Sequence, residues 1–249
     1  MYLPLTTNYD RVLTNWLNKL SFSPSNDSCK ALNTLLKGMR DDGNLIEMDL
    51  FHTIGGLQTD EQRLTPLIST SGLAFTTVNS PTLDSTGVTG SSAGASYVNL
   101  NWAPSTNGMK WTSTSASLGT YCRTNDAATV SNMGSAASFD STRRAGDLFY
   151  WRINDSGGNN AANTSSLGLS TVRRIASDST EIYMNGVSKG TGTTATTGLD
   201  ATAFTLCRHS GSGSSNRNLS LCFAGSGNIN VVSLYTRIQT YMTERGLNV

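Results

Sequence analysis

The stretch from Leu167 to Gly190 constrains the fold most, because it predicts two strands and a hairpin turn. Apolar and polar residues alternate up to a polar turn at Asp178-Ser179, and a second alternating run stops at Asn185-Gly186. Alternation with a period of two places Ile182 and Met184 toward a core. Asn-Gly suits a type I′ turn, because both residue types tolerate positive φ. We expect this segment at the centre of one sheet of an antiparallel β-sandwich.

Composition agrees with one large, mainly β domain. The chain has 249 residues, of which 37% are hydrophobic and only 14% charged, with 24 Gly. Its polar share falls on Ser, Thr, Asn and Gly, which suit strands and turns better than exposed helices.

Charge and hydropathy exclude several classes of partner. Lys+Arg 18 against Asp+Glu 17 gives a formal net charge of +1, without the basic excess that nonspecific phosphate binding needs. We therefore expect no nucleic-acid partner. No apolar run approaches the length of a membrane span, so we expect no membrane insertion. The first residues lack the pattern of a signal peptide, and we expect a soluble product that is not exported by one.

Longer helices are predicted near the two ends of the chain, and Asp60 to Ile68 is expected to form a turn or a short helix. Residues Tyr9 to Leu20 predict a short amphipathic helix, and Ser25 or Asn26 can cap a second one that runs to about Arg40. Gly43 suits the left-handed conformation just beyond it. A last helix is predicted from Asn230 to Arg245, packed on an edge or end of the sandwich.

Strands are expected between these helices, with Trp102, Phe149 and Ile153 in the core and the pairs Arg143-Arg144 and Arg173-Arg174 exposed. Besides the hairpin, the segments expected to form strands are 44–54, 97–102, 109–113, 119–124, 136–140, 147–154, 203–208 and 219–223.

Four cysteines are widely scattered and lack the paired spacing of a zinc site. Cys207 and Cys222 flank a loop and would be able to oppose each other on neighbouring strands. The favoured alternative is that both thiols are free and buried.

The order of several segments resembles the concanavalin A-like (laminin G-like) jelly-roll domain of bacteriophage virion proteins such as tail fibres, spikes and head fibres. The segments that carry the resemblance are Ala31 to Asp49, Asn79-Ser80-Pro81, Tyr97 to Ser105, Ser117 to Asn125, Glu181 to Gly186, and the closing SLYTRIQTYMTERG. The resemblance covers residues 25–249 and implies a jelly roll with N-terminal helices and a C-terminal helix. Residues 1–24 would then be a docking or oligomerisation segment, or a helical extension that caps the sandwich.

The resemblance also implies attachment or virion assembly in place of catalysis. We expect a noncatalytic fibre or spike, made in the bacterial host cytoplasm and carried in the virion. It would contact other virion proteins and a host-surface glycan as a homotrimer or another homo-oligomer. The alternatives are a decoration or adaptor subunit without a glycan ligand, and a glycoside hydrolase of the same fold.

The hydrolase alternative depends on Glu47-Met48-Asp49-Leu50-Phe51-His52. Retaining glucanases of this fold carry an ExDxxE strand whose outer carboxylates lie about 5 Å apart. Here His52 stands at the third acidic position, and Asp49 is interpreted as a buried or capping residue.

Sugar binding needs an aromatic face flanked by hydrogen-bonding groups. The expected ligand-binding residues are Trp111, Tyr121, Arg123, Asn125, Asp155, His209 and Arg217, and Trp151 and Arg152 are further candidates. No cofactor is expected, although the oxygens of Asp155-Ser156-Gly157 and Asn159-Asn160 would suit calcium. Surface turns explain the same residues equally well.

Overall fold

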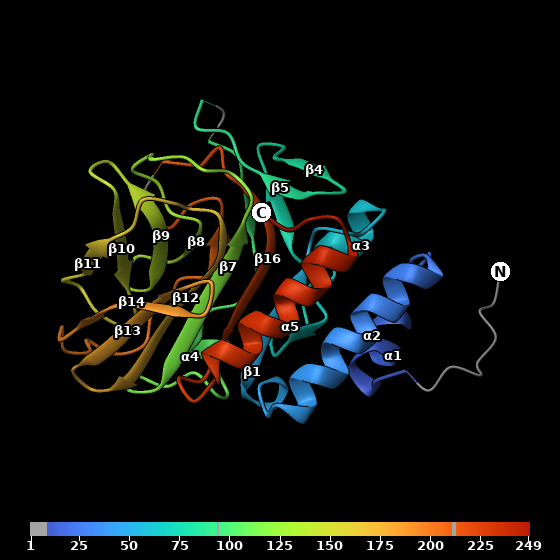
Figure 1. The fold of residues 1–249 in the computed structure, drawn as a ribbon, viewed down its shortest axis with the longest axis horizontal. Helices are drawn as coiled ribbons and strands as arrows, with labels where there is room; N and C mark the ends of the chain where they lie inside the picture. The colour runs from blue at the N-terminus through green and yellow to red at the C-terminus, as the bar shows by residue number, and fades with distance from the viewer. Residues whose placement is uncertain (1–8, 94, 211–212) are drawn as a thin grey trace.

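The computed structural model describes residues 9–93, 95–210 and 213–249, and they form two antiparallel sheets and a layer of helices (Figure 1). The nine-stranded sheet has the order β14 (Val187–Gly192), β13 (Ser179–Met184), β12 (Gly168–Ala176), β7 (Ala116–Cys122), β16 (Asn218–Gly225), β1 (Met48–Thr53) and β2 (Ile68–Ser69), with β5 (Gly87–Thr89) also paired to β16 and β4 (Thr82–Asp84) paired to β5. The seven-stranded sheet has the order β11 (Asn159–Ala162), β10 (Leu148–Arg152), β9 (Phe139–Arg144), β8 (Met133–Gly134), β15 (Thr205–Leu206), β6 (Tyr97–Asn99) and β3 (Thr76–Val78). This architecture confirms the predicted jelly-roll sandwich.

The predicted hairpin is formed by β12, β13 and β14. Ile182 and Met184 are buried, and Asn185 and Gly186 have φ of 53° and 75°, as a type I′ turn requires. Its predicted position at the centre of a sheet is wrong, because β7 and β16 lie there and β14 is an edge strand. Every residue of β7 is buried, whereas Val187 to Lys189 of β14 are exposed, so only β7 suits an interior position.

A hydrophobic core fills the space between the two sheets. Trp102, Phe149 and Ile153 lie in it and are fully buried, as predicted. The rings of Trp102, Trp111 and Phe204 meet edge to face, with centroids 5.2–5.8 Å apart. Such pairs add favourable quadrupole contacts to area burial.

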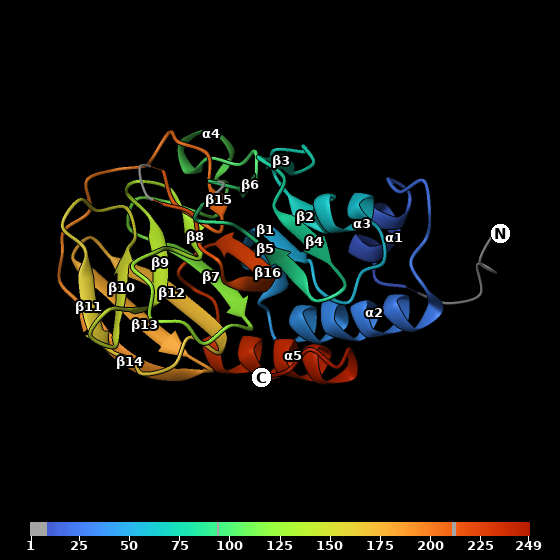
Figure 2. The ribbon, with the colours of Figure 1, turned by 90° about the horizontal axis from the view of Figure 1, so that it is seen from above.

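Helices α2 (Asn26–Asp41) and α5 (Val231–Glu244) cover the side of the nine-stranded sheet that faces away from the seven-stranded sheet (Figures 1 and 2). A second core joins them to the sheet through Phe51, Leu221 and Phe223. The C-terminal helix therefore covers a sheet face, and not the edge or end that the sequence predicted. Among the described residues, no helix combines the length and apolarity needed to cross a bilayer.

Both ends of α2 follow the sequence prediction, and α5 also begins at a capping residue that the sequence prediction did not include. The side chain of Ser25 accepts from the Ser28 N–H at the start of α2, and Asn230 caps α5 in the same way. Gly43 lies just past α2 with φ of 75°.

The described part of the N-terminal segment packs on the sandwich. Helix α1 (Arg11–Leu17) buries Leu13 and Trp16 in the second core, and the Trp16 indole N–H donates to the Thr65 carbonyl at 2.6 Å. Asp10 pairs with Arg40 at 2.8 Å. The rest of the expected docking segment, residues 1–8, lies outside the described residues.

Several local expectations differ from the structure. Segment 109–113 is not a strand, whereas β11 forms inside the expected loop 155–166. The predicted strand from residue 44 begins only at Met48, after a 3-10 turn (Leu45–Glu47) that leaves Ile46 60% exposed. The remaining helices are short, α3 (Asp60–Leu64) and α4 (Pro104–Asn107). All four cysteines are buried and free, so Cys207 and Cys222 form no disulfide.

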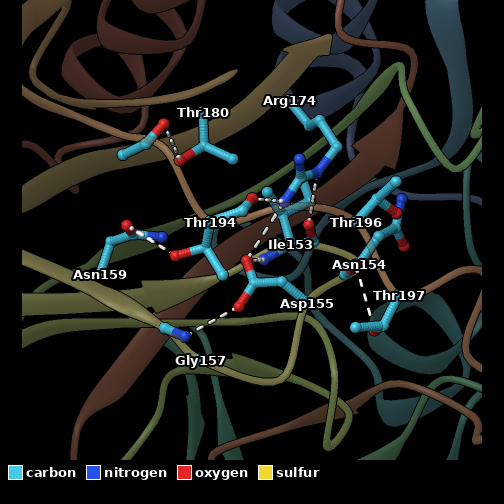
Figure 3. A network of polar contacts seen from close by, with 12 residues as sticks. Ile153, Asn154, Asp155, Gly157, Asn159, Arg174, Thr180, Thr194, Thr196 and Thr197 are labelled. Atoms are coloured by element: carbon cyan, nitrogen blue, oxygen red, sulfur yellow. Dashed lines mark hydrogen bonds and ion pairs between the residues drawn. The ribbon is translucent and has the colours of Figure 1, made fainter. Parts of the chain in front are cut away.

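An ion pair buried at one end of the sandwich joins the two sheets. Arg174 of β12 and Asp155, which follows β10, point toward one another and are fully buried, with 3.3 Å between Nη2 and Oδ2 (Figure 3). The other guanidinium N–H groups donate to the carbonyls of Ile153, Ala176, Ser177 and Thr194 at 2.7–3.2 Å. The prediction that Arg174 is exposed is therefore wrong. Its charge is stable inside because every donor has an acceptor.

We expect Arg174→Met to lower the free energy of unfolding by about 3–5 kcal/mol, because it leaves the Asp155 carboxylate buried without its cation. Arg173→Met is the matched control, since the neighbouring Arg173 pairs with Glu181 in a partly exposed position. That variant should lose about 1 kcal/mol or less. Urea denaturation monitored by fluorescence measures both, and equal losses would contradict a special role for the buried pair.

Candidate functional site

Four of the seven ligand-binding candidates are buried and already bonded within the protein. Trp111 donates its indole N–H to Asn154 at 2.9 Å, and the Tyr121 hydroxyl donates to Gln239 of α5 at 3.0 Å. Asp155 belongs to the pair with Arg174. Their positions show structural roles, because none of these side chains reaches the surface.

Arg217 is the fourth buried candidate, and it holds the loop after β7. Its guanidinium donates to the Asn132 side chain at 2.8 Å and to the carbonyls of Asp126, Ala128 and Arg143. Burial lowers the pKa of this guanidinium.

The other three candidates lie at or near the surface but bind different parts of the chain. Arg123 donates to the Leu247 carbonyl at 3.0 Å, and Asn125 accepts from Arg143 at 3.0 Å. His209 hydrogen-bonds to Ser131 at 2.7 Å. The structure therefore does not gather the seven residues into one site.

A different group of side chains meets around His209 on the outer side of the seven-stranded sheet, the side turned away from the nine-stranded sheet. The His209 ring stacks on Phe139 with centroids 4.2 Å apart and planes 10° apart. Phe139 in turn stacks on Tyr150 at 5.7 Å. The stack extends from β9 to β10, and its half-buried rings, Tyr150 and His209, form an aromatic surface over the buried Phe139.

Arginines lie over the rings of this surface. The Arg144 guanidinium carbon is 4.7 Å from the Tyr150 centroid, and that of Arg152 is 5.6 Å from Phe139. Tyr97 lies further along the sheet on β6, beyond β8 and β15, and the guanidinium carbon of Arg208 is 4.3 Å from its ring centroid. Cation–π contact of this kind holds each guanidinium at a fixed place. We call the whole group the aromatic–arginine face: Tyr97, Phe139, Arg144, Tyr150, Arg152, Arg208 and His209.

Strand alternation explains how the face is built. In β10, Phe149 and Trp151 point into the core, so Tyr150 and Arg152 point outward. Arg152 is the register partner of Phe139 in β9. A register shift further along the same pair brings Arg144 opposite Leu148, on the same outer side.

The face carries positive charge without acidic partners. Among the described residues, Arg144, Arg152 and Arg208 form no ion pair, whereas six other arginines do. Burial and, secondarily, the charges of Arg152, Arg144 and Arg208 lower the pKa of His209 to about 4. His209 is therefore a neutral ring at pH 7, beside three cations.

Sequence reasoning found part of this face. It proposed His209, considered Arg152, and expected Arg144 at the surface. It missed Tyr97, Phe139, Tyr150 and Arg208 as site residues. Alternation along residues 147–154 does place Tyr150 and Arg152 on the same side of a strand. No local pattern indicates that Phe139 and His209 stack.

The hydrolase segment has a structural role at Asp49 and His52. Asp49 is buried and accepts from the N–H groups of Met109, Lys110 and Trp111 at 2.8–3.1 Å, which confirms that it is a buried capping residue. His52 is buried and hydrogen-bonds to the Arg63 carbonyl at 2.9 Å.

In the segment considered for calcium, the carboxylate of Asp155 is already bound by groups of the protein. Asp155 accepts from Ile153 N–H and Gly158 N–H besides pairing with Arg174. In the described ranges, no group of three or more His, Cys, Asp or Glu side chains is placed to hold a metal ion.

Comparison with known proteins supports the fold and leaves the activity open. No family model and no curated protein sequence matches the chain. A solved sialidase from Trypanosoma rangeli is 10% identical with a TM-score of 0.52, and the match covers 86% of this chain but only 39% of the sialidase. Domain 4 of an extracellular arabinanase from Geobacillus stearothermophilus is 13% identical over 76% of this chain and 98% of that chain, with a TM-score of 0.47. The sialidase match shows a shared β-sandwich fold.

We expect His209 to stay neutral down to about pH 4 in an NMR titration. The unfolded chain takes up this proton near pH 6.5, so the contribution to stability is complete above pH 6.5 and is lost as the pH falls toward 4. Arg152→Gln should raise the pKa of His209, because it removes a nearby positive charge.

The buried His52 serves as the control in the same spectra, since burial lowers its pKa to about 4 and no arginine charge contributes. A His209 pKa near 6.5, or one that does not respond to Arg152→Gln, would contradict the described geometry.

Proposed function

We propose that this protein binds glycans without cleaving them, through the aromatic–arginine face. The observation that carries the proposal is the stacked surface of Phe139, Tyr150 and His209 with guanidinium groups held over its rings. Aromatic rings pack against the apolar side of a pyranose, and arginine N–H groups donate to its hydroxyls.

The construction of the face favours binding. Phe139 is buried and supports the half-buried Tyr150 and His209, so these rings are fixed before a ligand arrives. Fixed aromatic side chains lose little conformational entropy on binding. On the adjacent edge strand, Asn160 is exposed and is the register partner of Tyr150, so its amide offers further hydrogen bonds beside the ring.

The biological setting belongs to the same proposal. The protein is a bacteriophage fibre or spike, carried in the virion, that attaches to host-surface glycan as a homotrimer or other homo-oligomer. The support is the resemblance of residues 25–249 to phage jelly-roll domains. Several copies on one particle would multiply weak single-site contacts. Mass in solution tests the oligomer, and a subunit whose aromatic–arginine face is covered by another virion protein would favour the decoration or adaptor alternative.

Absence of catalysis is also part of the proposal, and it is supported by the engagement of Asp49 with three backbone amides. We expect no increase in reducing ends when the protein is incubated with the polysaccharide it binds. The same incubation with Glu47→Gln serves as the comparison. Release by the wild-type protein that disappears in Glu47→Gln would show a hydrolase instead.

We expect Tyr150→Ala to weaken binding of a glycan identified on an array by about fivefold, because a stacked ring contributes on the order of 1 kcal/mol. Tyr235→Ala is the matched control, since Tyr235 is half-buried on α5 in the helix layer. Calorimetric titration gives both affinities, and thermal melting verifies folding. Equal affinities in the two variants would remove the face from the proposed site.

A further inference from the structure

We propose that the glycan bound by the aromatic–arginine face is acidic, with one carboxylate on each of several sugar units. This inference rests on the proposed function and adds the chemical class of the ligand. It depends on three observations. Within the described chain, the arginines of the face have no carboxylate partners, some of their N–H groups have no acceptor, and they lie over different rings.

The positive charge of this face is local and uncompensated. The chain as a whole is nearly neutral, with Lys+Arg 18 and Asp+Glu 17. Six arginines elsewhere in the described ranges are paired, for example Arg40 with Asp10 and Arg237 with Asp42, both at 2.8 Å. In the described part of the chain, Arg144, Arg152 and Arg208 have aromatic neighbours where those others have carboxylates. Three cations on one face attract an anion.

Hydrogen-bond donors on the face also lack acceptors. The Nε atoms of Arg152 and Arg208 are buried without a hydrogen-bond partner, and Arg152 donates from Nη1 only to the Ala136 carbonyl at 3.3 Å. A buried donor without an acceptor raises the free energy of the unbound protein. A small rotation of either guanidinium would present Nε–H and Nη–H together to a carboxylate, in the bidentate geometry that the two groups share.

The arrangement of the cations favours several single charges over one multiply charged group. Arg144 lies over Tyr150, and Arg152 lies over the next ring, Phe139. Arg208 lies over Tyr97 on another strand. The three cations therefore lie over three different rings along the sheet. This suits a chain of uronate or sialate units whose carboxylates pair with successive guanidinium groups while a pyranose packs against the half-buried rings of Tyr150 and His209.

Matched pairs of oligosaccharides test the inference. The probes are oligogalacturonate and oligosialate, each beside its carboxyl-reduced neutral form, titrated calorimetrically into the full-length protein in 0.15 M NaCl. We expect at least one acidic probe to bind at least tenfold more tightly than its neutral form. Arg144→Gln and Arg208→Gln should each weaken the acidic form about tenfold and leave the neutral form unchanged.

Controls separate a built site from general charge attraction. Arg11→Gln removes an exposed charge on α1, in the helix layer, and should have no effect. Arg144→Lys keeps the charge and should retain part of the preference for the acidic form. Thermal melting verifies the fold of each variant.

The possible outcomes distinguish this inference from the proposed function. Equal affinity for the acidic and neutral forms overturns the carboxylate inference and leaves glycan binding intact. Binding to no member of the panel or of a glycan array overturns both. Dextran sulfate or oligo(dT) binding as tightly as the acidic sugars would show a general polyanion surface and also overturns the inference.

Discussion

The nine-stranded sheet is apolar on both sides, and the arrangement of the rest of the protein depends on covering both. One side packs on the seven-stranded sheet through Leu118, Val172 and Ile182. The other side presents Phe51, Leu221 and Phe223, which have to be removed from water by a further layer. Helices α2 and α5 supply that layer, so an early and a late segment of the chain lie on the same side of the sandwich (Figure 2). No helix of the described residues packs over the outer side of the seven-stranded sheet, and the candidate site is there.

Buried polar groups fix the loops between strands. Arg174, Arg217 and Asp49 are each buried, and each binds several backbone groups of segments that have no regular structure. Such segments contain many carbonyl and N–H groups that cannot pair within a ladder, so a charged side chain in the interior satisfies them. This requirement explains why charged and aromatic residues that look like ligand contacts in the sequence are structural. Their chemistry is used inside the protein.

The candidate site differs from these buried groups, because its arginines lie beside aromatic rings and have no carboxylate partners in the part of the chain that the structure describes. The guanidinium groups of Arg144, Arg152 and Arg208 have no carboxylate partner among the described side chains, whereas Arg173, which also lies over a ring, pairs with Glu181, and Arg237 pairs with Asp42. Stability alone would favour pairing these charges. What distinguishes this face of the described structure is that three arginines without carboxylate partners gather around one histidine. Similarity to the sialidase sandwich supports the fold and adds no activity.

The sequence by itself determined the local elements. Alternation in β10 and β13, the Asn185-Gly186 turn and the caps Ser25 and Asn230 are encoded within a few residues, because they depend on side-chain period and φ preference. It also indicated one site residue, His209, and the outward direction of Tyr150 and Arg152. Only the tertiary structure decided that β14 is an edge strand, that Trp111, Tyr121, Asp155 and Arg217 are buried, and that Phe139 stacks on His209. These features arise where strands distant in the sequence come together. The free energy that selects such pairings comes from packing of the whole interior, so it cannot be predicted from a local sequence pattern.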